Sequence, residues 1–328
     1  MGGTYWSDDT YAQRTTQRKA TGQSAFAYSQ AQASAPKGSQ RAHKSMDPFG
    51  IATRECRDSD AHLESRAIAI GLDVTGSMEA VPKTMQTELC KLMALLTKDG
   101  CVKDAAILMA GIGDAHCDSV PMQIGQFESG IEIENDLTNL YLEGGGGGQR
   151  KEDYELFLFF LARMTSIDCW EKRQKKGFAF IIGDEMPYPN VDRRFVHAVF
   201  GKTIEADIPL QTILDEARER WEIFYIMPNM TSYYNDKDVC DSLRKLFGEN
   251  YLRLDKPEGV CDLIVSTIAL LECGDLNAAT SALKAAGTDL AVIGAVENAL
   301  ADVAKSRGRT GCDLALAGSG AGSGIEAL

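Results

Sequence analysis

Residues 67–77 read AIAIGLDVTGS, an apolar run that ends in an aspartate followed closely by two hydroxyl residues. Because the run has no alternating polar face, it predicts a strand covered on both sides, as parallel sheets require. Runs of the same character occupy residues 105–110, 178–182 and 223–227. Helical patterns separate them, including apolar residues at steps of three and four between Met78 and Leu96. We therefore expect an α/β fold, doubly wound, with a mostly parallel sheet and helices on both faces.

Composition divides the chain into four parts. Residues 1–62 are expected to be an arm, largely disordered or ordered by a partner, because the first 45 are polar, with six basic and two acidic side chains. That basic arm could also lie against its own acidic body. Residues 63–273 carry the α/β pattern, and residues 274–307 predict a short helical extension. The Gly- and Ser-rich residues 308–328 predict a flexible tail.

Charge and cysteine content narrow the classes of partner and compartment. The 328 residues hold 34 Lys and Arg against 47 Asp and Glu, a net charge of -13, so nucleic-acid binding is not expected. Nine cysteines without a C-x-x-C pair predict reduced, structural thiols. Because no apolar run is long enough to span a bilayer, we expect a cytoplasmic protein without membrane contact.

Candidate functional residues follow the first and third apolar runs. Asp73, Thr75 and Ser77 alternate on the turn after the first run, and Asp184 follows the third. In an α/β sheet the ligand crevice lies at the carboxyl ends of the strands, so these side chains are expected to meet there. Carboxylate and hydroxyl oxygens are hard ligands, suited to Mg²⁺ or Mn²⁺. The sequence thus predicts a divalent metal site.

The D-x-T-x-S motif and the later Gly-Asp resemble the metal-ion-dependent adhesion site of von Willebrand factor A domains, over roughly residues 63–273. The resemblance implies that Thr75 and Ser77 bind the metal directly, whereas Asp73 and Asp184 act largely through water. It also implies that a protein partner completes the coordination with an Asp or Glu side chain. In intracellular members of that family the partner is often a AAA+ ATPase or another large assembly.

One part of the family pattern is missing. The family usually takes a further hydroxyl, most often that of a Thr, from a loop between the second and third core strands, whereas this chain has EGGGGGQRKED at residues 143–153. Glu143, Gln149 or Glu152 could replace that hydroxyl, as could a backbone carbonyl or a water. His116, at the same edge, could flank the site, and Tyr188, between two prolines, could contact a partner.

Three other interpretations remain open. Thr75 or Ser77 could simply cap the following helix. The Asp-x-Thr-Gly-Ser stretch also resembles the loop of haloacid-dehalogenase-like phosphotransferases, in which Asp73 would be the nucleophile and Asp184 an Mg²⁺ ligand. Finally, the domain could serve as a structural or scaffold subunit. We expect an interaction module rather than an enzyme.

Overall fold

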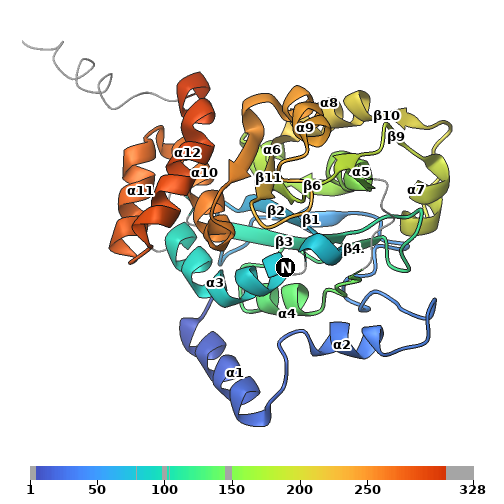
Figure 1. Ribbon diagram of the computed structural model, residues 1–328, viewed down its shortest axis with the longest axis horizontal. Helices are drawn as coiled ribbons and strands as arrows, with labels where there is room; N and C mark the ends of the chain where they lie inside the picture. The colour runs from blue at the N-terminus through green and yellow to red at the C-terminus, as the bar shows by residue number, and fades with distance from the viewer. Residues whose placement is uncertain (1–4, 79, 98–101, 103, 145–149, 308–328) are drawn as a thin grey trace, which may run out of the picture.

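A six-stranded sheet forms the centre of the computed structural model, which describes residues 5–78, 80–97, 102, 104–144 and 150–307 (Figure 1). Five strands are parallel, and the edge strand β4 runs antiparallel to β3. Across the sheet the order is β12 (Tyr251–Leu254), β11 (Trp221–Pro228), β7 (Gly177–Ile182), β2 (Arg66–Asp73), β3 (Ala105–Ile112) and β4 (Met122–Ile124). The chain is therefore a mixed α/β protein with a mostly parallel sheet.

The apolar runs fill two separate cores. In β2, Ile68 and Ile70 belong to one cluster and Ala67 and Ala69 to the other, because successive side chains of a strand point to opposite faces. The first cluster includes side chains of α3 (Ala80–Thr97), α4 (Glu132–Thr138), α10 (Val260–Cys273), α11 (Leu276–Ala285) and α12 (Leu290–Arg307). The second includes side chains of α5 (Tyr154–Arg163), α6 (Asp168–Glu171), α7 (Arg193–Phe200), α8 (Leu210–Arg220) and α9 (Lys237–Phe247).

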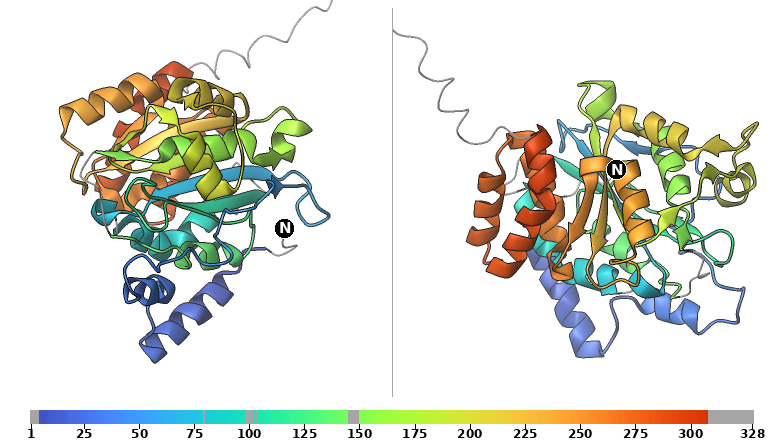
Figure 2. Two further views of the ribbon diagram at one scale, coloured as in Figure 1. Left: turned by 90° about the vertical axis from the view of Figure 1, so that its right-hand side faces the viewer. Right: turned by 45° about the horizontal axis from the view of Figure 1, so that its top comes forward.

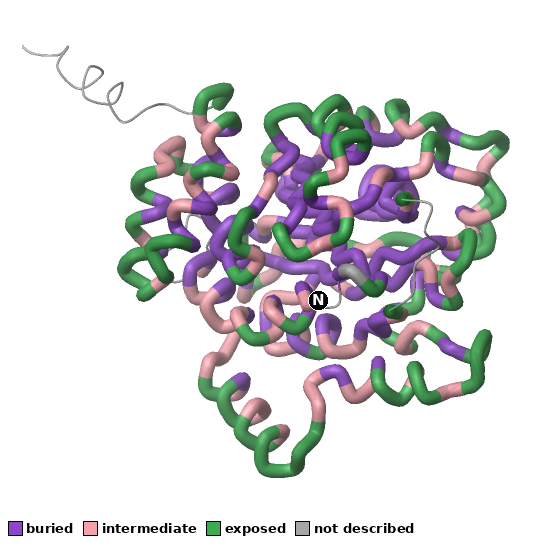
Figure 3. Tube along the Cα trace, in the orientation of Figure 1, coloured by how far each residue is buried: buried purple, intermediate pink, exposed green. Residues whose placement is uncertain are grey.

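Short elements complete the fold. Three pairs of short strands lie outside the main sheet: β1 (Arg54–Cys56) with β6 (Thr165–Ile167), β5 (Lys151–Glu152) with β8 (Met186–Pro187), and β9 (Asn190–Val191) with β10 (Ile208–Pro209). The 3₁₀ turns are η1 (Gly76–Met78), η2 (Gly248–Asn250) and η3 (Pro257–Gly259). The strands of the main sheet are almost wholly buried (Figure 3).

The first 62 residues, expected to be largely disordered or ordered by a partner, contain α1 (Asp8–Thr21) and α2 (Ala27–Ala33). Both views in Figure 2 show α1 projecting from the body. It is held by charge, because Arg14 and Arg18 both pair with Glu134 of α4, whose side chain is 1% exposed. Isolated buried side chains such as Met46 add apolar contact. Because these contacts are scattered along the segment, its sequence shows no periodic pattern of apolar residues.

Residues 274–307 share the main core. Leu283 of α11 and Val296 and Leu300 of α12 are fully buried in the same cluster as α10. A Cβ on Gly259 would lie 2.6 Å from Val292 Cγ1, so glycine permits the close approach of α12. The expectation of reduced thiols is wrong at Cys273, the last residue of α10, which is disulfide-bonded.

Candidate functional site

Asp73 ends strand β2 and is completely buried. Its Oδ1 accepts hydrogen bonds from Thr75 Oγ1 at 2.5 Å and from the Thr75 amide at 2.9 Å. Its Oδ2 accepts a hydrogen bond from Tyr154 Oη at 2.7 Å. Burial raises the pKa of Asp73 to about 7, the Thr75 hydrogen bonds oppose this, and the charge of Asp184 adds to it. Hydrogen bonds thus hold the carboxylate of Asp73 in place, and a second acid nearby raises its pKa.

That second acid, Asp184, comes from the neighbouring strand. Leu72 of β2 pairs with Ile182 of β7, so Asp73 and Asp184 follow their strands at nearly the same level. Asp184 is also completely buried, and its Oδ2 accepts a hydrogen bond from the Tyr233 amide at 3.4 Å. The sequence analysis predicted that these two acids, which are far apart in the chain, meet. Parallel pairing of β2 with β7 brings both of them to one edge of the sheet. Thr75 is buried beside Asp73, whereas the side chain of Ser77 lies outside the described part of the chain.

Backbone contacts gather more acidic residues at this edge. The pairing of β5 with β8 sets Glu152 opposite Pro187, two residues after Glu185. The Asp153 amide donates to the Gly113 carbonyl at 3.1 Å, which joins this segment to the end of β3. Asp114 and Asp118 follow β3 there, and Asp118 Oδ2 accepts a hydrogen bond from the Asp114 amide at 2.8 Å.

Several carboxylates of this edge have raised pKa values, because they are buried close to other acids. Burial, followed by the charge of Asp73, raises the pKa of Glu185 to about 8, and burial raises that of Asp153 to about 7. Burial, followed by the charge of Asp153, also raises the pKa of Glu155 well above its usual value. We call Asp73, Asp114, Asp118, Glu152, Asp153, Asp184 and Glu185 the acidic edge.

Glu152 differs from the other members of the acidic edge. Its side chain is 1% exposed, and no described group donates a hydrogen bond to its Oε2. Burial, followed by the charges of Asp73 and Glu185, raises its pKa to about 12. Of the other replacements for the missing Thr, Glu143 accepts hydrogen bonds from the amides of Ser119 and Val120, at 2.8 and 3.1 Å. Gln149 lies outside the described residues.

A cluster of aromatic side chains lies beside the acidic edge. The ring of His116 stacks on Tyr188 at 4.4 Å between centroids and meets Phe195 edge-on at 4.7 Å. Tyr188 Oη donates to Asp114 Oδ2 at 3.1 Å, and Lys151 Nζ lies 5.5 Å from the Tyr188 ring. His116, which the sequence offered as a flanking residue, and Tyr188, which it offered as a contact for a partner, therefore meet next to the acids. Tyr154 and Asp153 were not among the sequence candidates, although both open the helix that follows the glycine loop.

The side chains that could bind a metal ion are limited in number. Among the described residues, no three His, Cys, Asp or Glu side chains are arranged so that together they could hold a metal ion. Both oxygens of Asp73 already accept hydrogen bonds, so an ion beside it would bind through water or displace a donor. No helix within the described ranges combines the length and apolarity needed to cross a membrane.

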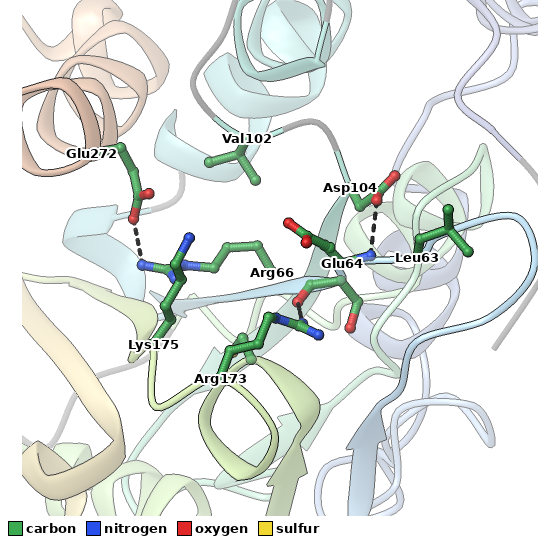
Figure 4. A pocket seen from close by; sticks show the side chains of 10 residues that line it. Leu63, Glu64, Arg66, Val102, Asp104, Arg173, Lys175 and Glu272 are labelled. Carbon is green, nitrogen blue, oxygen red and sulfur yellow. Dashed lines mark hydrogen bonds and ion pairs between the residues drawn. The ribbon is translucent and has the colours of Figure 1, made fainter.

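A cavity lies at the opposite edge of the sheet (Figure 4). It has a volume of about 480 Å³ and is lined by Arg66, Arg173, Lys175, Glu64, Asp104 and Glu272, among others. Arg66 begins β2 and Asp73 ends it, so this cavity and the acidic edge are separated by the length of the strand. Within it, Arg66 forms an ion pair with Glu272. The cavity is therefore not part of the candidate site.

Comparisons with known proteins do not assign this chain to a family. No family model matches the sequence, and no curated protein matches it. Among solved structures, the pilus adhesin SpaC from Lactobacillus rhamnosus GG aligns with a TM-score of 0.46 and 8% identity, over 66% of this chain and 31% of that chain. Proximal thread matrix protein 1 from the mussel byssus aligns with a TM-score of 0.41 and 12% identity, over 67% of this chain and 50% of that chain. The matched region thus spans about a third to a half of those chains, and likeness at this level shows no shared function.

Proposed function

We propose that this chain is a von Willebrand factor A-like, doubly wound α/β module that binds a protein partner through a divalent cation, Mg²⁺ or Mn²⁺. Asp73, Thr75, Ser77 and Asp184 would hold the cation, and the partner would supply an Asp or Glu side chain. The observation that carries the proposal is the meeting of Asp73 and Asp184, two completely buried acids, at the carboxyl ends of neighbouring parallel strands. By resemblance, the partner is a AAA+ ATPase or another large assembly.

The residues present fit a hard divalent cation. They offer carboxylate and hydroxyl oxygens, the ligands that Mg²⁺ prefers, with water in its remaining positions. Burial of several acids without matching cations costs free energy that a positive ion would recover. When bound, the cation supplies Lewis acidity toward an incoming carboxylate. The chain's own residues position it: Thr75 and Tyr154 orient Asp73, and the Tyr233 amide orients Asp184.

The same contacts disfavour the phosphotransferase alternative. A nucleophilic carboxylate needs an oxygen open to the substrate, whereas Asp73 is 0% exposed and Tyr154 and Thr75 donate to both its oxygens. The scaffold alternative stays open, because it requires only the fold. It predicts that removal of metal changes neither stability nor assembly.

The thermal midpoint of unfolding tests the proposal without knowledge of the partner. We expect Mg²⁺ or Mn²⁺ to raise the midpoint of the full chain relative to chelator, because a ligand held only by the folded state stabilises it by mass action. The rise should vanish in Asp73→Asn and in Asp184→Asn, which keep the size of each side chain. Asp136→Asn, which alters a buried acid of α4 outside the acidic edge, is the matched control. Equal midpoints in every condition would refute the metal site and favour the scaffold.

A further inference from the structure

The cavity at the start of β2 contains charged groups of both signs. Strand β2 contributes Arg66, the segment before it contributes Glu64, and the segment between α6 and β7 contributes Lys175. In Figure 4 the side chains of Glu64 and Lys175 reach the cavity from opposite sides. Two bases and an acid therefore line one space of about 480 Å³, a volume typical of sites for small molecules.

Two of the basic groups that line this cavity are neutralised within the chain. Arg66 forms an ion pair with Glu272. Arg173 donates hydrogen bonds to both carboxylate oxygens of Asp58, at 2.7 and 3.0 Å. Each pair joins one charge of each sign, so together they give the cavity no net charge.

Lys175 and Glu64 have no such partner. Within the described part of the chain, neither side chain forms an ion pair or a hydrogen bond. A second acid, Asp104, lies on the side of Glu64, since its Oδ2 accepts a hydrogen bond from the Glu64 amide at 3.1 Å. The cavity thus has a positive side and a negative side that do not neutralise each other.

Arg66 adds donors to the positive side. Its side chain is 11% exposed, and its guanidinium lies 4.7 Å from the centre of the Phe178 ring. No described residue accepts a hydrogen bond from its Nε or Nη1, although both atoms are buried. Buried donors without an acceptor are costly, and native proteins retain them mainly where something else satisfies them. A carboxylate bound beside Lys175 would bring negative charge and acceptor oxygens to this guanidinium.

We propose that this cavity binds a small zwitterion, namely a free amino acid with an apolar side chain. Its carboxylate contacts Lys175 and Arg66, and its ammonium group contacts Glu64. A simple anion would leave Glu64 unpaired and a simple cation would leave Lys175 unpaired, so only a ligand with both charges matches both sides. Val102 and Leu63, which is 71% exposed, line the same cavity and offer contact to an apolar side chain. The inference goes beyond the proposed function, because it does not depend on the acidic edge.

Direct binding to the full-length protein tests the inference. Isothermal titration calorimetry compares L-leucine with two analogues of the same carbon skeleton: isocaproate, which lacks the ammonium group, and isoamylamine, which lacks the carboxylate. We expect leucine to bind at least about tenfold more tightly than either analogue, because each analogue loses one charge-assisted contact. An analogue that binds within about twofold of leucine would overturn the zwitterion. Absence of leucine binding at millimolar concentrations would overturn the site itself.

Two substitutions test which residue meets which charge. Lys175→Gln should abolish the preference for leucine over isoamylamine, and Glu64→Gln should abolish the preference for leucine over isocaproate. Both residues are exposed, so neither change should disturb the fold, which circular dichroism checks. Lys245→Gln, at an exposed position of α9, is the matched control and should bind leucine as the wild type does. Unchanged selectivity in Lys175→Gln and Glu64→Gln would overturn the assignment.

Discussion

The two edges of the central sheet treat their acidic residues in opposite ways. At the edge where β2 and β7 begin, two acids have basic partners: Asp58 pairs with Arg173 at 2.7 Å, and Asp168 pairs with Arg57 at 2.8 Å. At the acidic edge, where the same strands end, the carboxylates crowd together. The difference teaches that ion pairs neutralise acids of the first edge, whereas within the described part of the chain Asp73, Glu152 and Glu185 form no ion pair with Lys, Arg or His.

The pKa shifts of the two edges have opposite directions. Burial alone would raise the pKa of Asp58, but hydrogen bonds from Arg173, Ser65 and Lys172 lower it well below its usual range. Burial also acts on Glu185, where no hydrogen bond from a base opposes it, and there the pKa rises to about 8. Burial raises the pKa of both acids, and the presence of basic partners at Asp58 reverses the net direction there.

The largest expected effect concerns the construction of the acidic edge. In Gly183→Ala, the new Cβ would overlap Tyr154 Oη and lie 3.0 Å from Tyr225 Oη, both on completely buried side chains. We expect a loss of about 3 kcal/mol of unfolding free energy, measured by urea denaturation. Gly294→Ala, where a Cβ meets nothing within 4 Å, is the control. A variant as stable as wild type would show that the Tyr154 hydroxyl is free to move, and that Asp73 is less constrained than its contacts indicate.

The next largest effect is expected at the edge where β2 and β7 begin, where Asp58 pairs with Arg173. In Asp58→Asn, Arg173 loses a charged partner that accepts from two of its nitrogens, at 2.7 and 3.0 Å. We expect a cost of about 2 kcal/mol at pH 7, because the guanidinium stays partly buried. The exposed pair Asp302 and Lys305 provides the comparison, since Asp302→Asn should change stability by less than about 0.5 kcal/mol. Equal effects of Asp58→Asn and Asp302→Asn would remove the distinction between the two edges.

Asp136, a buried acid that lies at neither edge, allows a prediction of how stability depends on pH. Burial raises the pKa of Asp136 to about 7, opposed by the Gln126 amide and supported by the charge of Glu128. Between its usual value of 3.8 and about 7, the folded chain therefore binds more protons here than the unfolded chain. Stability should accordingly fall as pH rises through this window.

Asp136→Asn isolates this contribution, because its amide oxygen can still accept from the Gln126 amide. We expect the variant to lose part of the decline in unfolding free energy between pH 4 and 8, by about 2 kcal/mol in total. Urea denaturation at several pH values in chelator measures it. Parallel curves for variant and wild type would mean that the carboxyl group of Asp136 is not shifted.

The smallest expected effect concerns the hydrogen bond from Tyr154 to Asp73. Tyr154→Phe removes the hydroxyl that donates to Asp73 Oδ2 at 2.7 Å and leaves the ring packed against Tyr225. We expect a cost of about 1 kcal/mol without cation. Added Mg²⁺ or Mn²⁺ should recover part of that loss, because the freed oxygen becomes available to the ion. Recovery in Asp73→Asn as well would show that the cation acts elsewhere.

Sequence patterns predict most of the central sheet because burial on both faces leaves a local signature. The run at residues 178–182, for example, predicts a strand that the structure places at β7. Antiparallel β4, only three residues long, has no such signature. The same holds for α1, whose position depends on an ion pair between Arg18 and Glu134, 116 residues apart.

The candidate site divides in the same way. Asp73, Thr75 and Asp184 can be found from the sequence because each follows a strand directly, where chain order alone places it at the carboxyl end. Glu152 is one of three replacements that the sequence offers for the missing hydroxyl, and only the fold shows it buried with no described donor to its Oε2. Local patterning specifies strands and the residues at their ends, because those depend on neighbours in the chain. The balance of charge between distant segments is decided by tertiary packing, because burial and pairing are properties of the assembled fold.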